Sequence, residues 1–413
     1  MSAALPADIS KNTLTQMLQF KVIGITDHPN PSFHKEVEAL IATSSVFSGG
    51  SRHHEIMADR LPKGAKWIDI TVPLSAVFQQ YSALDCPIVV FASGDPLFYG
   101  FATTLKRKFP EVEIQVFPTF HSLQMLAHKL VLPYHDLTLV SLTGRPWNAL
   151  DAALIEGKQK IGCLTDRNHT PSAIAQRMID YGYSNYKIAI GEHLGNPDKE
   201  IVETMSLNEA AKRTFLLPNC CILMQEYPNE MIPMGIPDEA FAILEGRPKM
   251  ITKMPFRLLS IQQLGLRSDS VLWDVGFCTG SISIEAKRLF PSIDVIAFEI
   301  RNEGEALMRE NTRRFGTPGI LPVIGDFLTQ DLSRFPAPTN VFIGGHGGKL
   351  KEIMARICEV LKPGGCIVMN CVTTDSNRLF DEACAALPLS QQASISLTLN
   401  DFNPITIKKC IKL

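Results

Sequence analysis

Short apolar runs rich in Val, Ile and Phe alternate with longer stretches in which apolar residues recur at helical spacing. This alternation predicts strands joined by crossover helices, the pattern of an α/β protein. In the first half, an apolar run at 220–224 closes the series. The other predicted strands are 21–26, 87–92, 112–117, 137–142, 160–165 and 185–190, and the predicted helices are 34–43, 98–108, 121–129 and 171–181.

Residues 227–239 interrupt this alternation. The segment YPNEMIPMGIPDE has three prolines, one glycine and no periodicity, which is typical of a linker between domains. We therefore predict two domains, 1–232 and 233–413. The predicted strands of the second domain are 271–275, 294–299, 321–325, 340–344 and 366–372, and two more near 393–399 and 404–411 are expected to form a terminal hairpin.

Composition narrows the class of protein. The 413 residues include 40 Lys and Arg against 42 Asp and Glu, so no overall field favours nucleic acid or an acidic membrane. Apolar residues make up 45% of the chain, which is too many for a disordered protein, and no uncharged run is long enough to span a membrane. The N-terminus has no basic segment followed by an apolar one, so no signal peptide is expected.

The ten cysteines stand singly apart from Cys220 and Cys221, with no spacing typical of a metal site. We interpret them as reduced core thiols and expect no bound metal. We also expect a cytoplasmic location and assembly as a homo-oligomer.

The strongest chemical signal lies in the second half, in VLWDVGFCTGSISIEAKRLF (271–290). It predicts a strand, a glycine-containing turn and a helix whose N-terminus faces the ligand side of the sheet. Glu299 ends the next strand, 25 residues after Asp274, where a carboxylate can accept both hydroxyls of a ribose. Asp326 ends the following strand, and Gly344 begins the turn after the fourth.

Two other interpretations fit parts of this pattern. The glycines could simply terminate strands while the acids cap helices. Dinucleotide binding also uses glycines and a ribose-binding acid, but Ser283 occupies the position of the third glycine in a G-x-G-x-x-G spacing that begins at Cys278.

The motif D-x-G-x-x-T-G-S, the acids after the next two strands and the final GG-x-GG resemble class I S-adenosylmethionine methyltransferases. With the upstream ITKMPFR (251–257), they resemble the decarboxylating methyltransferase domain of the cobalamin pathway. Cys278 stands where that family usually has a glycine, and His346 replaces a small residue. The resemblance implies a class I Rossmann-like domain whose S-adenosylmethionine contacts are Thr252, Gly276, Cys278, Thr279, Gly280, Glu299, Asp326, Phe327 and Gly344.

The first half resembles the tetrapyrrole methylases (class III fold) over most of residues 20–226. The motifs on which this resemblance depends include VVFASGDPLFYGFA (89–102), FHSLQ (120–124) and SGGSRHHE (48–55). Together they resemble the branch of the family that methylates C-5 of the precorrin ring. The resemblance implies that Gly94, Asp95 and Ser122 contact the cofactor. The first strand departs from the family, because it runs into GITDHPN instead of G-x-G-P-G.

Two adjacent resemblances imply a fused enzyme that methylates a precorrin at C-5 and C-15 with decarboxylation. Because the substrate carries many carboxylates, basic side chains near the strand ends are candidate contacts. Lys253, Arg257 and His346 are the predicted catalytic residues, while Arg52, Arg301 and Lys349 are weaker candidates. The alternative is an RNA or protein methyltransferase with a non-catalytic N-terminal scaffold. That alternative would favour a basic face, and none stands out.

Overall fold

The computed structural model describes residues 18–247, 250–400 and 404–413, which form two compact units. Of these residues, the first unit contains 18–143, 162–173 and 187–224, and the second contains 144–161, 174–186 and the described residues from 225 onward. The predicted division after residue 232 stays a prediction. Within the described ranges, no helix combines the length and apolarity needed to cross a bilayer.

The first unit begins with five parallel strands in the order β3-β2-β4-β1-β5. Val22 and Ile23 are neighbours on β1 but belong to separate cores, one containing α4 and α5 and the other α2 and α3. The sheet is therefore covered on both faces. The elements are β1 (Gln19–Ile25), α2 (Lys35–Thr43), β2 (Val46–Gly49), α3 (Ser51–Met57), η1 (Ala58–Arg60), β3 (Lys66–Asp69), α4 (Leu74–Ser82), β4 (Ile88–Ser93), α5 (Phe101–Lys108) and β5 (Glu113–Phe117).

A second five-stranded sheet follows, in the order β6-β7-β10-β8-β9, with β9 antiparallel to β8 at its edge. Leu123 and Leu126 of α6 pack against Ile222 of the central strand β10. The elements are α6 (Ser122–Lys129), β6 (Thr138–Ser141), α7 (Asn148–Ile155), β7 (Lys160–Leu164), α8 (Pro171–Asp180), β8 (Tyr186–Glu192), β9 (Ile201–Ser206), α9 (Leu207–Ala210) and β10 (Asn219–Gln225).

The sheet of the second unit has the order β13-β12-β11-β14-β15-β18-β16, with β17 paired to β18. The strands from β13 to β15 are parallel, whereas β18 runs antiparallel between β15 and β16. The predicted terminal hairpin is confirmed as β17 and β18. The strands are β11 (Val271–Val275), β12 (Asp294–Glu299), β13 (Ile320–Ile324), β14 (Asn340–Ile343), β15 (Cys366–Cys371), β16 (Leu389–Gln391), β17 (Ile395–Leu397) and β18 (Ile405–Lys412).

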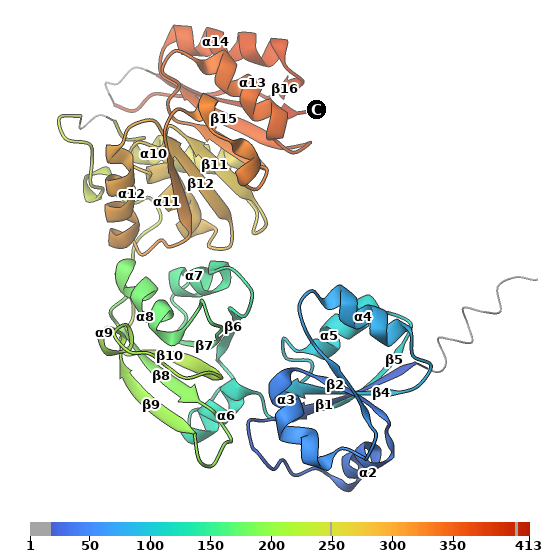
Figure 1. Ribbon diagram of the computed structural model, residues 1–413. Helices are drawn as coiled ribbons and strands as arrows, with labels where there is room; N and C mark the ends of the chain where they lie inside the picture. Colours follow the sequence, from blue (N-terminus) through green and yellow to red (C-terminus); the bar gives the residue numbers. More distant parts are fainter. Residues whose placement is uncertain (1–17, 248–249, 401–403) are drawn as a thin grey trace, which may run out of the picture. The chain divides into compact units, whose positions relative to one another are not determined.

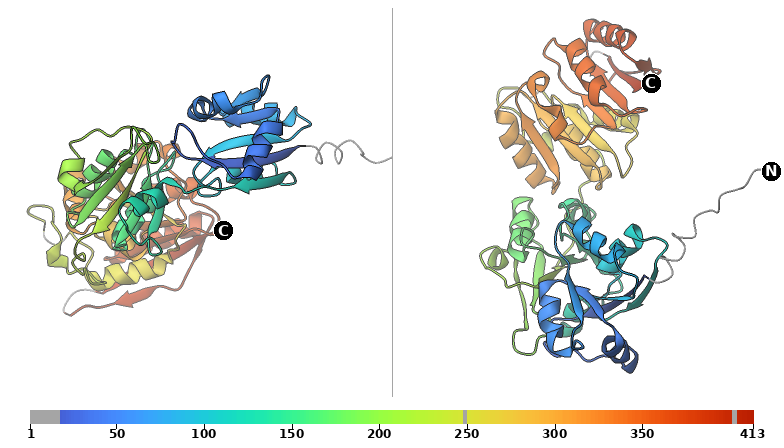
Figure 2. Two further views of the ribbon diagram at one scale, coloured as in Figure 1. Left: turned by 90° about the horizontal axis from the view of Figure 1, so that it is seen from below. Right: turned by 45° about the vertical axis from the view of Figure 1, so that its right-hand side comes forward.

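Helices cover both faces of this sheet, as Figures 1 and 2 show. Leu272 packs with the helices α10 to α12, while its neighbour Trp273 packs with α13 and α14, as expected for alternating side chains on a buried strand. The helices are η2 (Asp238–Ala240), α10 (Met254–Leu264), α11 (Ser281–Leu289), α12 (Glu303–Arg314), η3 (Phe327–Thr329), η4 (Leu332–Arg334), α13 (Leu350–Val360) and α14 (Thr374–Ala386).

The strand order reverses between β11 and β14. Their connecting chains leave on opposite faces of the sheet, so a crevice opens at the carboxyl ends of these strands. The turns predicted to carry the chemistry of the second unit, after β11, β12, β13 and β14, all meet at this edge.

Arg257 ties the segment before α10 to the helix layer. Its side chain is fully buried, and Nε donates to Oε2 of Glu285 on α11 at 2.7 Å, while Nη1 donates to Oδ1 of Asp238 at 3.1 Å and to the carbonyl oxygen of Thr252 at 2.8 Å. Glu285 also accepts the backbone N–H of Gly235 at 2.6 Å. The expectation that Arg257 contacts substrate is therefore corrected, because its side chain is fully buried, is absent from the cavity lining and donates to protein groups.

Replacing Arg257 by Ala should lower the stability of the second unit by about 3–5 kcal/mol, because Glu285 would remain buried without its partner. Calorimetry of the full chain should show a lower midpoint for the corresponding thermal transition. The exposed Arg378, which pairs with Asp375 and Glu382, is the matched control, and Arg378→Ala should leave the midpoint nearly unchanged. Equal effects of the two substitutions would contradict this interpretation.

Candidate active sites

The crevice of the second unit opens into a cavity of about 750 Å³. Its lining comes from the carboxyl ends of β11 to β15 and from the segment leading into α10. Predicted site residues that line it are Thr252, Lys253, Gly276, Cys278, Thr279, Glu299, Asp326, Phe327, Gly344 and His346.

The turn after β11 approaches the turn after β14 closely. Gly276 has a φ of +78°, and a Cβ atom on it would lie 2.7 Å from the backbone nitrogen of Gly345. Any side chain at Gly276 would separate the two turns. Gly280, also in the left-handed region, is the N-cap of α11 and packs near Met308, so it shapes the turn without lining the cavity.

Cys278 occupies the left-handed region with a φ of +51°, which most side chains disfavour. Its Sγ donates to the carbonyl oxygen of Met250 at 3.0 Å, and its backbone N–H donates to Oε2 of Glu299 at 2.9 Å. The residue that replaces the family's usual glycine therefore links the turn to the segment before α10.

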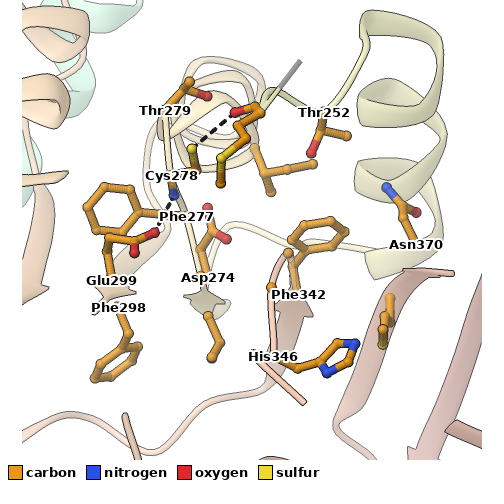
Figure 3. Close-up of a pocket in the computed structure, with 18 of the residues that line it drawn as sticks. Thr252, Asp274, Phe277, Cys278, Thr279, Phe298, Glu299, Phe342, His346 and Asn370 are labelled. Carbon is orange, nitrogen blue, oxygen red and sulfur yellow. Dashed lines mark hydrogen bonds between the residues drawn. The ribbon is translucent and has the colours of Figure 1, made fainter. Parts of the chain in front are cut away.

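Glu299 ends β12 with only 2% of its surface exposed. Besides Cys278, its carboxylate accepts the backbone N–H of Arg301 at 3.1 Å and Nη1 of Arg301 at 3.0 Å, both on Oε1. Figure 3 shows Glu299 and Phe277 on one side of the cavity and His346 and Asn370 on the other. The carboxylate is thus held rigidly at the cavity edge by two backbone N–H groups and the guanidinium of Arg301.

Asp274 is a buried acid that lines the same cavity. Its Oδ2 accepts the hydroxyl of Ser283 at 2.6 Å, but Oδ1 has no hydrogen-bond partner among the described residues, and neither has Oγ1 of the adjacent Thr279. Burial raises the pKa of Asp274 to about 7, and the charge of Glu299 adds to the rise. Unpartnered buried polar atoms at a cavity wall indicate a polar ligand group. Asp274 was not among the predicted contacts, although it is the acid of the D-x-G motif.

Asp326 and Lys349 form an ion pair of 3.1 Å at the cavity mouth. Oδ1 of Asp326 also accepts the backbone N–H of Leu328 at 3.0 Å, and this contact, followed by Lys349, lowers the pKa of the Asp326 carboxyl. Phe327 is buried and packs edge-on against Phe298 with a centroid distance of 5.0 Å.

The far end of the cavity combines apolar residues with a few polar groups. Nδ1 of His346 accepts the backbone N–H of Gly348 at 3.2 Å, so the ring proton is on Nε2, and burial lowers the pKa of His346. Lys253 lies 3.5 Å from Asp238, a loose pair. Asn370, which sequence reasoning missed because it follows no motif, holds Oδ1 2.9 Å from the hydroxyl of Ser260.

The first unit has its own cavity, of about 470 Å³, at the carboxyl ends of β1 and β4. Gly94 and Ser122 line it as predicted. Asp95 does not, because its Oδ1 accepts the backbone N–H of Leu97 at 2.8 Å and stabilises its own turn. A Cβ atom on Gly24 would lie 2.0 Å from the carbonyl oxygen of Gly94, so the single glycine kept in GITDHPN is the one that this approach requires.

His121 forms another part of this cavity wall. Its ring stacks on Phe98 with a centroid distance of 3.7 Å, and Nδ1 accepts the backbone N–H of Gln124 at 3.3 Å. Burial lowers the pKa of His121 to about 4, so the ring is neutral near pH 7. Among the described residues of the whole chain, no group of three His, Cys, Asp or Glu side chains could hold a metal ion.

Comparison with known proteins gives a match for each half. The model of the tetrapyrrole (corrin/porphyrin) methylases matches residues 34–211, and that of the precorrin methyltransferase domain matches residues 246–389. The predicted fold class, a tetrapyrrole methylase fold followed by a methyltransferase fold, is therefore confirmed.

Individual relatives agree with these matches. A cobalt-precorrin-6B C(15)-methyltransferase (decarboxylating) of Salmonella typhimurium is 32% identical over 41% of this chain and 85% of its own length. A solved structure titled precorrin-6y C5,15-methyltransferase, from Geobacter metallireducens, is 31% identical and covers 44% of this chain and all of its own, with a TM-score of 0.39. The precorrin-6Y C(5,15)-methyltransferase (decarboxylating) of Sinorhizobium sp is 32% identical over 86% of this chain and 84% of its own length. On that similarity, the chain belongs to the family of decarboxylating precorrin-6Y C(5,15)-methyltransferases.

Proposed function

We propose that the chain methylates a precorrin at C-5 and C-15 and removes the carboxyl group of the ring C acetate, with S-adenosylmethionine as methyl source. The first unit would act at C-5, and the second at C-15 and on the acetate. The observation that carries the proposal is that each unit opens a cavity at the carboxyl ends of neighbouring parallel strands, where glycine permits a close approach between two backbone segments. Family membership across both halves favours this substrate over RNA or protein.

The residues of the second cavity fit an adenosyl amino acid. The rigid carboxylate of Glu299 is suited to ribose hydroxyls, and Asp326 lies where a base edge would be expected. The unpartnered oxygens of Asp274 and Thr279 would take the amino-acid end. When bound, S-adenosylmethionine supplies an electrophilic methyl group.

The chain's own contribution would be positioning and exclusion of water. Because Gly276 and Gly345, where the two turns approach, carry no side chains, a ligand can lie against backbone at that point of the cavity. At the far end, the neutral His346 and the amide of Asn370 would orient the macrocycle by hydrogen bonds. A carboxylate held by neutral groups there is not stabilised by an ion pair, which favours loss of carbon dioxide.

Homo-oligomerisation and the cytoplasmic location stay predictions.

The direct test is incubation of the full chain with a precorrin substrate and S-adenosylmethionine, followed by mass spectrometry. We expect the product to gain two methyl groups and lose one carbon dioxide. Methyl gains with full retention of carboxyl groups would contradict the decarboxylation. Parallel reactions with metal-free and cobalt-containing precursors would identify the natural substrate.

Replacing Glu299 by Gln should weaken binding of S-adenosylhomocysteine at one of two sites by at least about tenfold, because charged hydrogen bonds to the ribose would be lost. Isothermal titration calorimetry of the full chain measures this. Glu303→Gln, an exposed substitution in the first turn of α12, is the control and should leave both sites intact. Equal affinity of the Glu299 variant and the parent would exclude the ribose contact.

Binding at the second site should release a proton at pH 6. Asp274, whose pKa is about 7 in the free protein, is then mostly protonated, and a cationic amino group nearby would ionise it. The calorimetric enthalpy at pH 6 should therefore depend on the ionisation enthalpy of the buffer. The dependence should disappear at pH 8.5, where Asp274 is already ionised, and in Asp274→Asn at either pH. Buffer-independent heats at pH 6 would refute the linkage.

A further inference from the structure

A polar cluster on the wall of the first cavity is not used by the proposed chemistry. It consists of Asp27, Arg52, His53, Ser93 and His193, called here the Ser93 cluster. The first four line the cavity, and Ser93 is the exposed last residue of β4, immediately before Gly94. The cluster therefore lies at the strand edge where ligands of α/β folds bind.

The hydroxyl oxygen of Ser93 accepts two hydrogen bonds. Nη2 of Arg52 donates to it at 2.8 Å, and Nε2 of His53 lies 3.0 Å away. Nδ1 of His53 accepts the backbone N–H of Gly50 at 3.3 Å, which leaves the ring proton on Nε2 as the donor to Ser93. Burial, followed by the charge of Arg52, lowers the pKa of His53 to about 4, so this neutral tautomer persists near pH 7.

Because both lone pairs of the Ser93 oxygen are occupied, its own proton must be donated elsewhere. No described residue accepts this proton in the structure, and because Ser93 is exposed, the proton is available to a group that enters the cavity. Since one of the two donors is a cation, the O–H bond of Ser93 is polarised and is a stronger donor than an ordinary serine hydroxyl.

Arg52 is held in place by a buried carboxylate. Nη1 donates to Oδ1 of Asp27 at 2.6 Å, and Nδ1 of His193 lies 2.7 Å from Oδ2 of the same carboxylate. Asp27 is only 9% exposed, whereas the Arg52 side chain is 34% exposed and its Nε–H has no acceptor in the described part of the chain. The guanidinium is thus fixed by two hydrogen bonds, and its Nε–H and one N–H on each Nη atom are left over as donors.

The donors left over in this cluster, which include the Ser93 hydroxyl and Nε of Arg52, require an acceptor-rich group. A ring N–H of a tetrapyrrole would not satisfy them, whereas a carboxylate offers two oxygens. We propose that the Ser93 cluster binds one carboxylate arm of the macrocycle and thereby sets which edge of the ring presents its carbon to the first cavity. This inference rests on the proposed function and adds the residues that orient the substrate for it.

The test is Ser93→Ala in the full chain, with the C-5 and C-15 methylation rates measured separately by product analysis. We expect the KM for precorrin in the C-5 reaction to rise about tenfold, as for loss of a hydrogen bond to a charged group. C-15 methylation in the second unit is an internal control and should not change. Ser93→Thr keeps the hydroxyl and should restore the parent KM, while Ser82→Ala on the surface of α4 is the matched serine control.

S-adenosylmethionine also carries a carboxylate. A second measurement therefore tests whether the Ser93 cluster binds the precorrin or the methyl donor. In a Glu299→Gln background, calorimetry with S-adenosylhomocysteine reports mainly on the first site. We expect Ser93→Ala to leave this affinity unchanged. A loss of S-adenosylhomocysteine affinity, or an unchanged KM for precorrin, would overturn the proposal. Absence of C-5 methylation by the parent chain would instead refute the proposed function itself.

Discussion

Both cavities depend on a backbone approach that only glycine permits. In the first unit, Gly24 near the end of β1 lies against Gly94, which follows β4, and in the second, Gly276 after β11 lies against Gly345 after β14. In each case the two strands are hydrogen-bonded neighbours in a parallel sheet. A Cβ atom at Gly24 or Gly276 would push the two backbone segments apart. Both folds thus rely on glycine at a close backbone approach between neighbouring parallel strands.

Charge is handled differently in the two units. In the second, carboxylates stand at successive strand ends, and Glu299 and Asp274 are buried close enough for one to raise the pKa of the other. This arrangement is costly in an empty site and suits a ligand that brings hydroxyls and a positive charge. In the first unit, Asp27 is neutralised internally by Arg52, and hydrogen-bond donors remain facing the cavity. The second unit also pairs Glu299 with Arg301 at 3.0 Å, so the difference between the sites lies in Asp274, a buried acid with no cationic partner among the described residues.

Much of the fold followed from apolar periodicity, because most strands of the parallel sheets are buried on both faces and read as continuous apolar runs. The strands that were not predicted explain the limit of this signal. β2 has four residues, and the edge strand β9 is largely exposed, so neither gives a long apolar run. The functional residues likewise divide into those that the sequence reveals and those that it does not. Glu299 and Gly276 could be found because they follow strands at motif spacing, whereas the roles of Arg257, Asn370 and Ser93 depend on partners distant in sequence.

The antiparallel strand β18 lies between β15 and β16, and Ile405 at its start lines the cavity of the second unit. During synthesis β18 leaves the ribosome after every other strand of its sheet. Until then β15 has an open edge, and the wall that Ile405 completes is missing. The wall that Ile405 completes can therefore form only after β18 has been synthesised, whereas every strand of the two five-stranded sheets precedes residue 226.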